Sequence, residues 1–94
     1  MSEIRIKLPS QLDMGALPGL KEELLSALTA TSAVTVEAAD VERVGTPALQ
    51  LLLAAARDVL QGGRAFTLHA PSEALMLAFD DLGLGAQARE WSAA

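Results

Sequence analysis

The segment from Val41 to Leu53 most constrains the fold, because a polar loop becomes a strongly apolar helix within it. Its sequence is VERVGTPALQLLL. Thr46 is a residue type that favours the N-cap, and Pro47 suits the first helical position because its missing N–H would have no intrahelical partner. We therefore expect a helix from Pro47 to about Gln61, with the Thr46 hydroxyl presented at the positive end of the helix dipole.

Other segments alternate between strand-like and helix-like patterns. Residues 3–8 alternate polar and apolar side chains, which predicts a half-buried outer strand, and residues 33–38 and 65–68 favour two further strands. A short antiparallel strand is expected at residues 11–13. Helices are expected over residues 15–30 and from an N-cap at Ser72 to a Schellman ending at Gly83 and Leu84, with a short amphipathic turn over residues 87–91. This order predicts an α/β fold, in which a small, mostly parallel four-stranded sheet is packed with three to four helices.

Composition restricts the possible functions of the chain. With 94 residues and 51% hydrophobic content, residues 1–94 are expected to form one domain with a single core and little surplus for a buried catalytic cleft. The net charge of -5 and the scattered basic residues disfavour binding to nucleic acid. The absence of cysteine excludes disulfides and thiol chemistry. No apolar run resembles a signal peptide or is long enough to insert in a bilayer, so we expect a cytoplasmic protein.

The central helix carries apolar residues on more than one face. At 100° per residue, one face is expected to form the core, and Leu51 points away from it, flanked by Ala48 and Ala55. Two interpretations follow: these residues are packed under a neighbouring element, or they form an exposed docking surface. The expected core face consists of Leu49, Leu52, Leu53, Ala56 and Leu60.

No group of polar residues indicates catalysis. Glu37, Asp40 and Glu42 surround the loop before the central helix, where solvated charges are the simpler interpretation and a cation site the alternative. His69 has no nucleophile motif to serve, so no catalytic residue, metal or cofactor is expected. Trp91 is expected to fold back over the domain, the alternative being an interface anchor.

Residues 4–84 resemble a STAS domain, the fold of bacterial anti-sigma-factor antagonists. The matching stretches are residues 12–18, 44–49, 70–72 and 82–84, in the right order and at the right spacing. The resemblance implies a non-catalytic module for signal transduction that binds proteins and that, in some members, is phosphorylated on a Ser or Thr at the start of the second helix. The residue that matches this position is Thr46.

The resemblance also implies where a partner would bind. Gly45, Thr46, Pro47, Ala48 and Leu51 would form the contact, with the face of the third helix as a further part of it. The partner would be an anti-sigma factor or a kinase-like regulator. A phosphate on Thr46 would repel an acidic partner or recruit one that carries arginine. The family's usual Asp before the hydroxyl is Gly45 here, and Pro47 and Ala48 replace the small residue and glycine that usually follow. Other members act as accessory subunits of transporters, including lipid-transport ATPases, or belong to chemotaxis systems, and these remain the alternatives.

Overall fold

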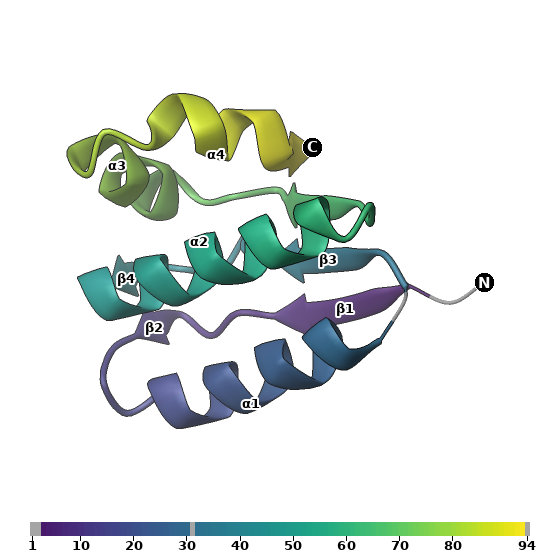
Figure 1. Ribbon diagram of the computed structural model, residues 1–94. Helices are drawn as coiled ribbons and strands as arrows, with labels where there is room; N and C mark the ends of the chain where they lie inside the picture. The colour runs from purple at the N-terminus through teal and green to yellow at the C-terminus, as the bar shows by residue number, and fades with distance from the viewer. Residues whose placement is uncertain (1–2, 31, 94) are drawn as a thin grey trace.

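The computed structural model describes residues 3–30 and 32–93, and Figure 1 shows the arrangement of their helices and strands. Most elements lie where the sequence patterns predict them, with ends that differ by one or two residues. In chain order the elements are β1 (Ile4–Lys7), β2 (Gln11–Leu12), α1 (Leu17–Thr29), β3 (Val34–Glu37), β4 (Arg43–Val44), α2 (Thr46–Gln61), β5 (Phe66–His69), α3 (Glu73–Asp81), α4 (Gly85–Trp91) and β6 (Ser92–Ala93).

The main sheet has four strands in the order β1-β3-β5-β6, and every pair in it is parallel. The expected α/β fold is therefore confirmed, with β1 at one edge. Helices α1 and α2 lie side by side over one face of this sheet, whereas α3 and α4 lie beyond β5 (Figure 1). Because the chain reaches α2 from the end of β3 through β4, α2 begins at the carboxyl edge of the sheet, where ligands of open α/β folds usually bind.

Strands β2 and β4 form a second, two-stranded sheet in which Gln11 pairs with Arg43. This pairing is parallel, so the expected antiparallel strand at residues 11–13 is wrong. The reason is that β1 and β3 are parallel neighbours. The chain runs on from β1 through Pro9 and Ser10 into β2, and from β3 into β4, so the two short strands also run in the same direction. The Ser10 carbonyl oxygen accepts hydrogen bonds from the N–H groups of Glu42 and Arg43, at 2.7 and 3.0 Å, which holds the two extensions together.

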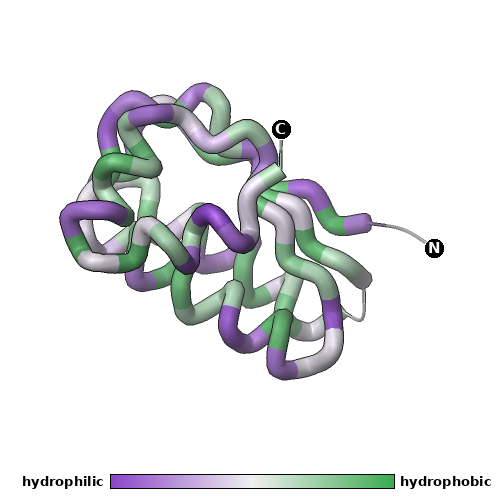
Figure 2. Tube along the Cα trace, turned by 90° about the horizontal axis from the view of Figure 1, so that it is seen from above, coloured by the Kyte–Doolittle hydropathy of each residue, from purple (hydrophilic) through white to green (hydrophobic). Residues whose placement is uncertain are grey.

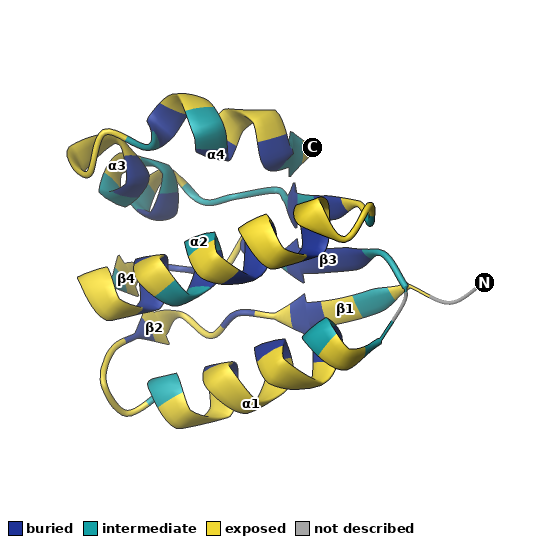
Figure 3. Cartoon of the chain, viewed as in Figure 1, coloured by how far each residue is buried: buried dark blue, intermediate teal, exposed yellow. Residues whose placement is uncertain are grey.

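The core lies between the main sheet and the helices, and Figure 3 shows how the buried residues follow the inner faces of α1, α2 and α3. Hydrophobic and hydrophilic stretches alternate along the chain in Figure 2, as amphipathic helices require. Trp91 folds back as expected. Its ring meets those of Phe66 and Phe79 edge-on, with centroids 5.5 and 6.2 Å away, and so attaches α4 to β5 and α3.

The face of α2 that is buried lies roughly 50° around the helix axis from the expected face, about half of the 100° between successive residues. Leu60, expected in the core, is 43% exposed, whereas Ala48 and Ala55 are buried. The reason is that α1 packs alongside α2 (Figure 1) and covers the flank that was expected to face water. The residues of α2 that are buried are Ala48, Leu49, Leu52, Ala55, Ala56 and Val59.

Helix ends in the rest of the fold are stabilised by specific polar contacts. Ser72 caps α3, and its Oγ accepts a hydrogen bond from the Leu75 N–H at 3.1 Å. The expected Schellman ending of α3 is confirmed, because the N–H groups of Gly83 and Leu84 donate back to the last turn. At the end of α1, Arg64 supplies a cap that the sequence did not indicate: its guanidinium donates to the Ala27 carbonyl oxygen at 2.9 Å.

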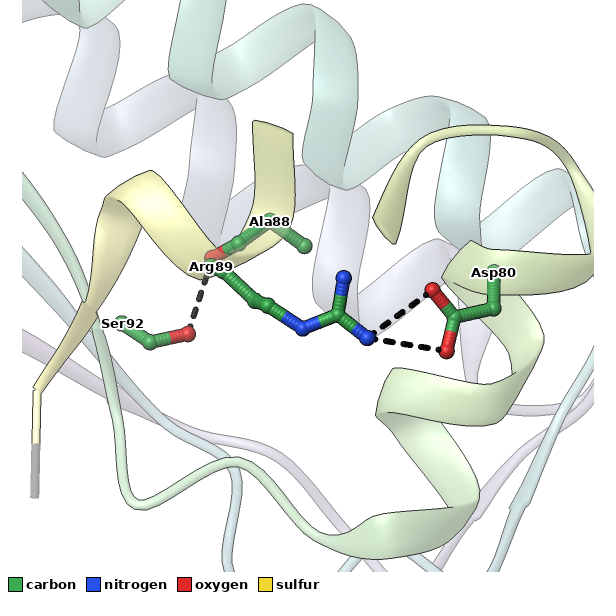
Figure 4. A network of polar contacts seen from close by, with 4 residues as sticks. All are labelled: Asp80, Ala88, Arg89 and Ser92. Atoms are coloured by element: carbon green, nitrogen blue, oxygen red, sulfur yellow. Dashed lines mark hydrogen bonds and ion pairs between the residues drawn. The ribbon is translucent and has the colours of Figure 1, made fainter. Parts of the chain in front are cut away.

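A network of polar contacts joins α3 to α4 (Figure 4). Arg89 donates from one nitrogen to both carboxylate oxygens of Asp80 at 3.2 Å, and Ser92 Oγ donates to the Ala88 carbonyl oxygen at 2.8 Å. Gly85 lies directly beneath Asp80, where a Cβ would come within 1.6 Å of a carboxylate oxygen. A side chain at position 85 would therefore displace the Asp80 carboxylate from its contact with Arg89.

One buried polar side chain interrupts the apolar core within the described residues. Thr35, in the middle of β3, is 5% exposed, and its hydroxyl donates a hydrogen bond to the Glu3 carboxylate. This hydrogen bond lowers the pKa of Glu3, and the neighbouring Arg5 guanidinium lowers it further. Glu3 directly precedes β1, which begins at the end of the sheet opposite the start of α2 (Figure 1), so Glu3 has no part in the site described next.

Candidate functional site

The candidate site is centred on the first turn of α2, where the structure corrects the expected position of the cap. Gly45 is the N-cap, Thr46 is the first helical residue and Pro47 the second, and no side chain caps this end. Thr46 is therefore not a capping residue. Thr46 is exposed at the positive end of the helix dipole, and its hydroxyl makes no capping hydrogen bond.

Gly45 takes the cap position because its backbone belongs to both the small sheet and the helix. Its N–H donates to the Leu12 carbonyl oxygen at 2.9 Å, which continues the β2–β4 pairing. Its own carbonyl oxygen accepts from the N–H groups of Ala48 and Leu49, at 3.1 and 3.3 Å. The extended conformation at Gly45 ends the strand, and the helix starts at the next residue.

A shallow hollow of about 600 Å³ lies between α1 and α2, beside Pro47. Leu51 is half-buried and lines it, so this side chain is neither fully packed nor fully presented to solvent. Lys21 contributes the one charged group to its lining. We call this the α1–α2 hollow, and its residues are Leu17, Pro18, Lys21, Pro47, Gln50 and Leu51.

A second depression of about 560 Å³ lies between the start of α1, strand β4 and helix α3. Met14 and Leu77 stand at its rim and are 73% and 54% exposed, so two large apolar side chains meet solvent beside one depression. It shares Leu17 and Pro47 with the α1–α2 hollow, so the two depressions adjoin. We call it the α3 groove, and its residues are Leu12, Asp13, Met14, Leu17, Glu42, Arg43, Val44, Gly45, Pro47, Ala48, Ala74, Leu77, Ala78 and Asp81.

The exposed position of Met14 follows from the turn that precedes α1. The Asp13 carboxylate accepts a hydrogen bond from the Gly15 N–H at 3.1 Å, and its carbonyl oxygen accepts one from the Ala16 N–H at 3.1 Å. Such a turn closed by an Asp side chain satisfies the local backbone without help from the core. It leaves Met14 at the tip of the turn, where the side chain meets solvent.

The structure brings most of the predicted site residues together. Gly45, Thr46 and Pro47 are consecutive at the helix start, and Leu51 lies one turn further along beside Pro47. Ala48 is 0% exposed although it belongs to the lining of the α3 groove, so its contact with a partner stays a prediction. It packs inward because the flank of α2 that carries it faces the core and α1.

Sequence reasoning included the face of the third helix in the contact without naming Leu77, and it missed Met14. Leu77 does carry a signal, because at 100° per residue it points about 160° away from Leu75 and Phe79, the two residues that α3 buries. Met14 carries none, because its exposure depends on the turn geometry at Asp13.

Two of the three charged candidates belong to ion pairs, whereas the third, Glu42, lines the α3 groove. Asp40 pairs with Lys7 at 3.5 Å, and Glu37 lies 3.9 Å from Arg5. Within residues 3–30 and 32–93, no three His, Cys, Asp or Glu side chains are arranged to hold a metal ion. His69 is half-buried at the end of β5, where it pairs in register with Glu37.

In the described part of the chain, no helix combines the length and the apolar character that a membrane-spanning helix needs.

Comparisons with known proteins now identify the class of this fold. Residues 1–87 match the family model described as "Mlab, STAS domain". The chain therefore belongs to this STAS domain family, as the resemblance of its motifs implied. No curated protein sequence matches it.

A solved structure shows the same fold. The anti-sigma factor antagonist SpoIIAA, in its unphosphorylated form, matches with a TM-score of 0.77 and 19% sequence identity, over 98% of this chain and 78% of that chain. The observed architecture, with four helices and a parallel four-stranded main sheet, is thus that of a STAS domain.

Proposed function

We propose that this STAS domain is a non-catalytic regulatory module that binds another protein through the surface around the start of α2. The observation that carries the proposal is that two adjoining apolar depressions meet at Pro47, next to the exposed hydroxyl of Thr46. Adjoining apolar surface of this kind marks a protein contact more often than a reaction site, which needs several convergent polar groups.

We further propose that phosphorylation of Thr46 switches this contact. The solved relative is an anti-sigma factor antagonist described in its unphosphorylated form, which links phosphorylation to a protein of the same fold. In this chain, Thr46 is the first residue of α2 and its hydroxyl is not used as a cap. A phosphate there would add a charge of about -1.5 to -2 beside the positive end of a helix dipole, where the helix itself tolerates it.

A second candidate is a constitutive accessory subunit of a membrane transporter, such as the ATPase of a lipid-transport system. The observation that favours it is the apolar character of both depressions, because permanent interfaces are more apolar than switched ones. In this case Thr46 would contribute only a polar contact, and Gly45 in place of the family's usual Asp would be of no consequence.

Affinity capture from the native cell, followed by mass spectrometry, tests the proposal. We expect the tagged chain to capture a protein that Leu51→Asp no longer captures, and we expect a phosphate on Thr46 in part of the recovered chain. Leu25→Asp is the matched control, because Leu25 is 51% exposed on α1 but lines neither depression.

The same experiment separates the two candidates. Release of the captured protein after treatment with the cell's kinase fraction and ATP supports the switch. A partner that stays bound with stoichiometry unchanged by that treatment, and that is a transporter ATPase, supports the constitutive subunit. Equal capture by the wild type and by Leu51→Asp would contradict both.

A further inference from the structure

The α3 groove combines an apolar interior with a charged rim. Its floor includes Leu12 and Val44, and the exposed side chains of Met14 and Leu77 stand on its two sides. Strand β4 packs against α3, so the groove offers side chains and not a free strand edge. An apolar trough of this kind suits an amphipathic helix, which inserts large side chains from one face.

The rim of the groove is mainly acidic. Asp13, Glu42 and Asp81 line it, against the single cation Arg43. Within residues 3–30 and 32–93, none of these four side chains lies within ion-pair distance of an opposite charge, whereas other acidic residues do. The groove therefore presents a net negative rim that the described residues do not neutralise.

Several of the chain's own cations are engaged elsewhere in the fold. Arg5, Lys7 and Arg89 belong to ion pairs, and Arg64 caps the end of α1. The net charge of the chain is -5, so a second copy would bring more negative charge to the rim. A fatty acid or an anionic lipid would meet the same repulsion.

We propose that the α3 groove receives an amphipathic helical segment of the protein partner, with large apolar side chains facing the groove and Lys or Arg on either side of them. The proposal rests on the proposed function in one respect, namely that the partner is a protein. The apolar face would cover Met14 and Leu77, and the flanking cations would meet Asp13, Glu42 and Asp81. Charge complementarity of this kind sets both specificity and the rate of association.

A displayed peptide library tests this directly. The library would hold helix-forming peptides of about 16 residues, roughly four turns, with random apolar residues on one face and random charges beside it. Selection on the wild-type chain is expected to enrich peptides whose flanking positions carry Lys or Arg. Enrichment of acidic or neutral flanks would overturn the proposal, as would the failure to enrich any peptide.

Variants locate the selected peptide on the groove, with affinity measured by fluorescence anisotropy of the labelled peptide. We expect Leu77→Asp to weaken binding about tenfold or more, and since Leu77 is exposed, this variant should keep the wild-type melting temperature. The triple variant Asp13→Asn, Glu42→Gln and Asp81→Asn keeps the groove apolar and leaves an oxygen at position 13 for Gly15. We expect it to weaken binding about fivefold and to reduce the salt dependence.

Leu25→Asp adds the same charge outside the groove and should bind the peptide as the wild type does. A peptide that binds Leu77→Asp as well as the wild type, or whose affinity is unaffected by the triple variant, would overturn the proposal. So would a concentration-dependent dimer that Leu77→Asp abolishes in sedimentation equilibrium, because the occupant would then be a second copy.

Capture from the native cell distinguishes failure of this inference from failure of the proposed function. If Leu77→Asp captures the partner as well as the wild type does, while Leu51→Asp does not, the inference fails and the proposed function stands. If no captured protein depends on Leu51, the proposed function fails, and the peptide selection still decides whether the groove binds basic amphipathic helices.

Discussion

Helices α2 and α3 both begin next to a hydroxyl residue and a proline, yet they use the hydroxyl differently. At α3, the Ser72 side chain accepts a hydrogen bond from the Leu75 N–H and caps the helix. At α2, the hydroxyl residue is already inside the helix, and Gly45 provides the cap with its backbone alone. The order of the two residues also differs, because proline precedes Ser72 and follows Thr46.

The difference shows that a Ser or Thr near a helix start does not always cap the helix. Ser72 is half-buried and its oxygen is satisfied, so its contribution is to stability. Thr46 is exposed and makes no capping hydrogen bond, so its hydroxyl remains accessible to a partner or a kinase. Variants at the two ends should therefore separate stability from binding.

The largest loss of stability is expected from removing the side chain that packs α4 against α3 and β5. Trp91→Ala should lower the free energy of unfolding by about 3–5 kcal/mol, because its ring packs against Phe66 and Phe79. Urea denaturation followed by circular dichroism measures this. In the same background, Ser72→Ala should cost less than it does in the wild type, since a cap matters only when the helix is packed. A loss below about 1 kcal/mol for Trp91→Ala would contradict the packing described.

The next effect concerns binding at the other helix start. Thr46→Glu should weaken binding of the captured partner, raising its Kd about tenfold, or by about 1.4 kcal/mol. The melting temperature should not fall, because negative charge is favourable at a helix N-terminus. Titration calorimetry and thermal denaturation measure the two quantities. Thr46→Gln has similar bulk without the charge and is the matched control. Equal affinities for the wild type and Thr46→Glu would remove the support for a switch and favour the constitutive subunit.

Removing the hydroxyl group at each of the two helix starts shows how much each one contributes to stability. Ser72→Ala should lower the free energy of unfolding by about 1 kcal/mol, because the Leu75 N–H loses its acceptor. The matched variant Thr46→Ala should stay within about 0.5 kcal/mol of the wild type, because no capping bond is lost and alanine favours the helix. Chemical denaturation of both variants, at one pH and salt concentration, gives the difference. Equal losses would mean that Thr46 caps α2 after all.

The smallest effect is expected from supplying the missing side-chain cap. Gly45→Asp should raise the free energy of unfolding by a few tenths of a kcal/mol, because aspartate is a better N-cap than glycine. The backbone at Gly45 is extended, and a Cβ would meet only ordinary contacts, at 3.6 Å from the Leu12 carbonyl oxygen. Gly45→Asn controls for the charge. A decrease in stability would show that the pairing with Leu12 does not accept a side chain.

Long, patterned elements were predictable from the sequence, and very short ones were not. The helix that begins after Ser72 and its ending at Gly83 carry local signals, which the structure bears out. Strands β4 and β6 have two residues each, too few to show any periodicity, and they exist because neighbouring strands pair with them. The antiparallel direction predicted for β2 was wrong for the same reason. Its parallel pairing with β4 is set by the strands that precede the two, and not by its own two residues.

The candidate site was predictable in part. The position of Thr46 at the start of α2, and of Pro47 beside it, follows from residue preferences that act locally. The burial of Ala48 and the exposure of Leu60 depend on where α1 packs, which the pattern of α2 alone does not contain. The α3 groove joins segments that are distant in sequence, so Met14 and Leu77 could not be assigned to one surface in advance.

The double role of Gly45 has a consequence for recognition. One residue ends the strand pairing and starts the helix, so no flexible linker separates Thr46 from the small sheet. Proline at the next position removes one more backbone rotation. A partner that docks here meets a surface already fixed in shape, and little conformational entropy is lost on association. Affinity at such a preorganised surface should respond directly to single chemical groups, including one phosphate.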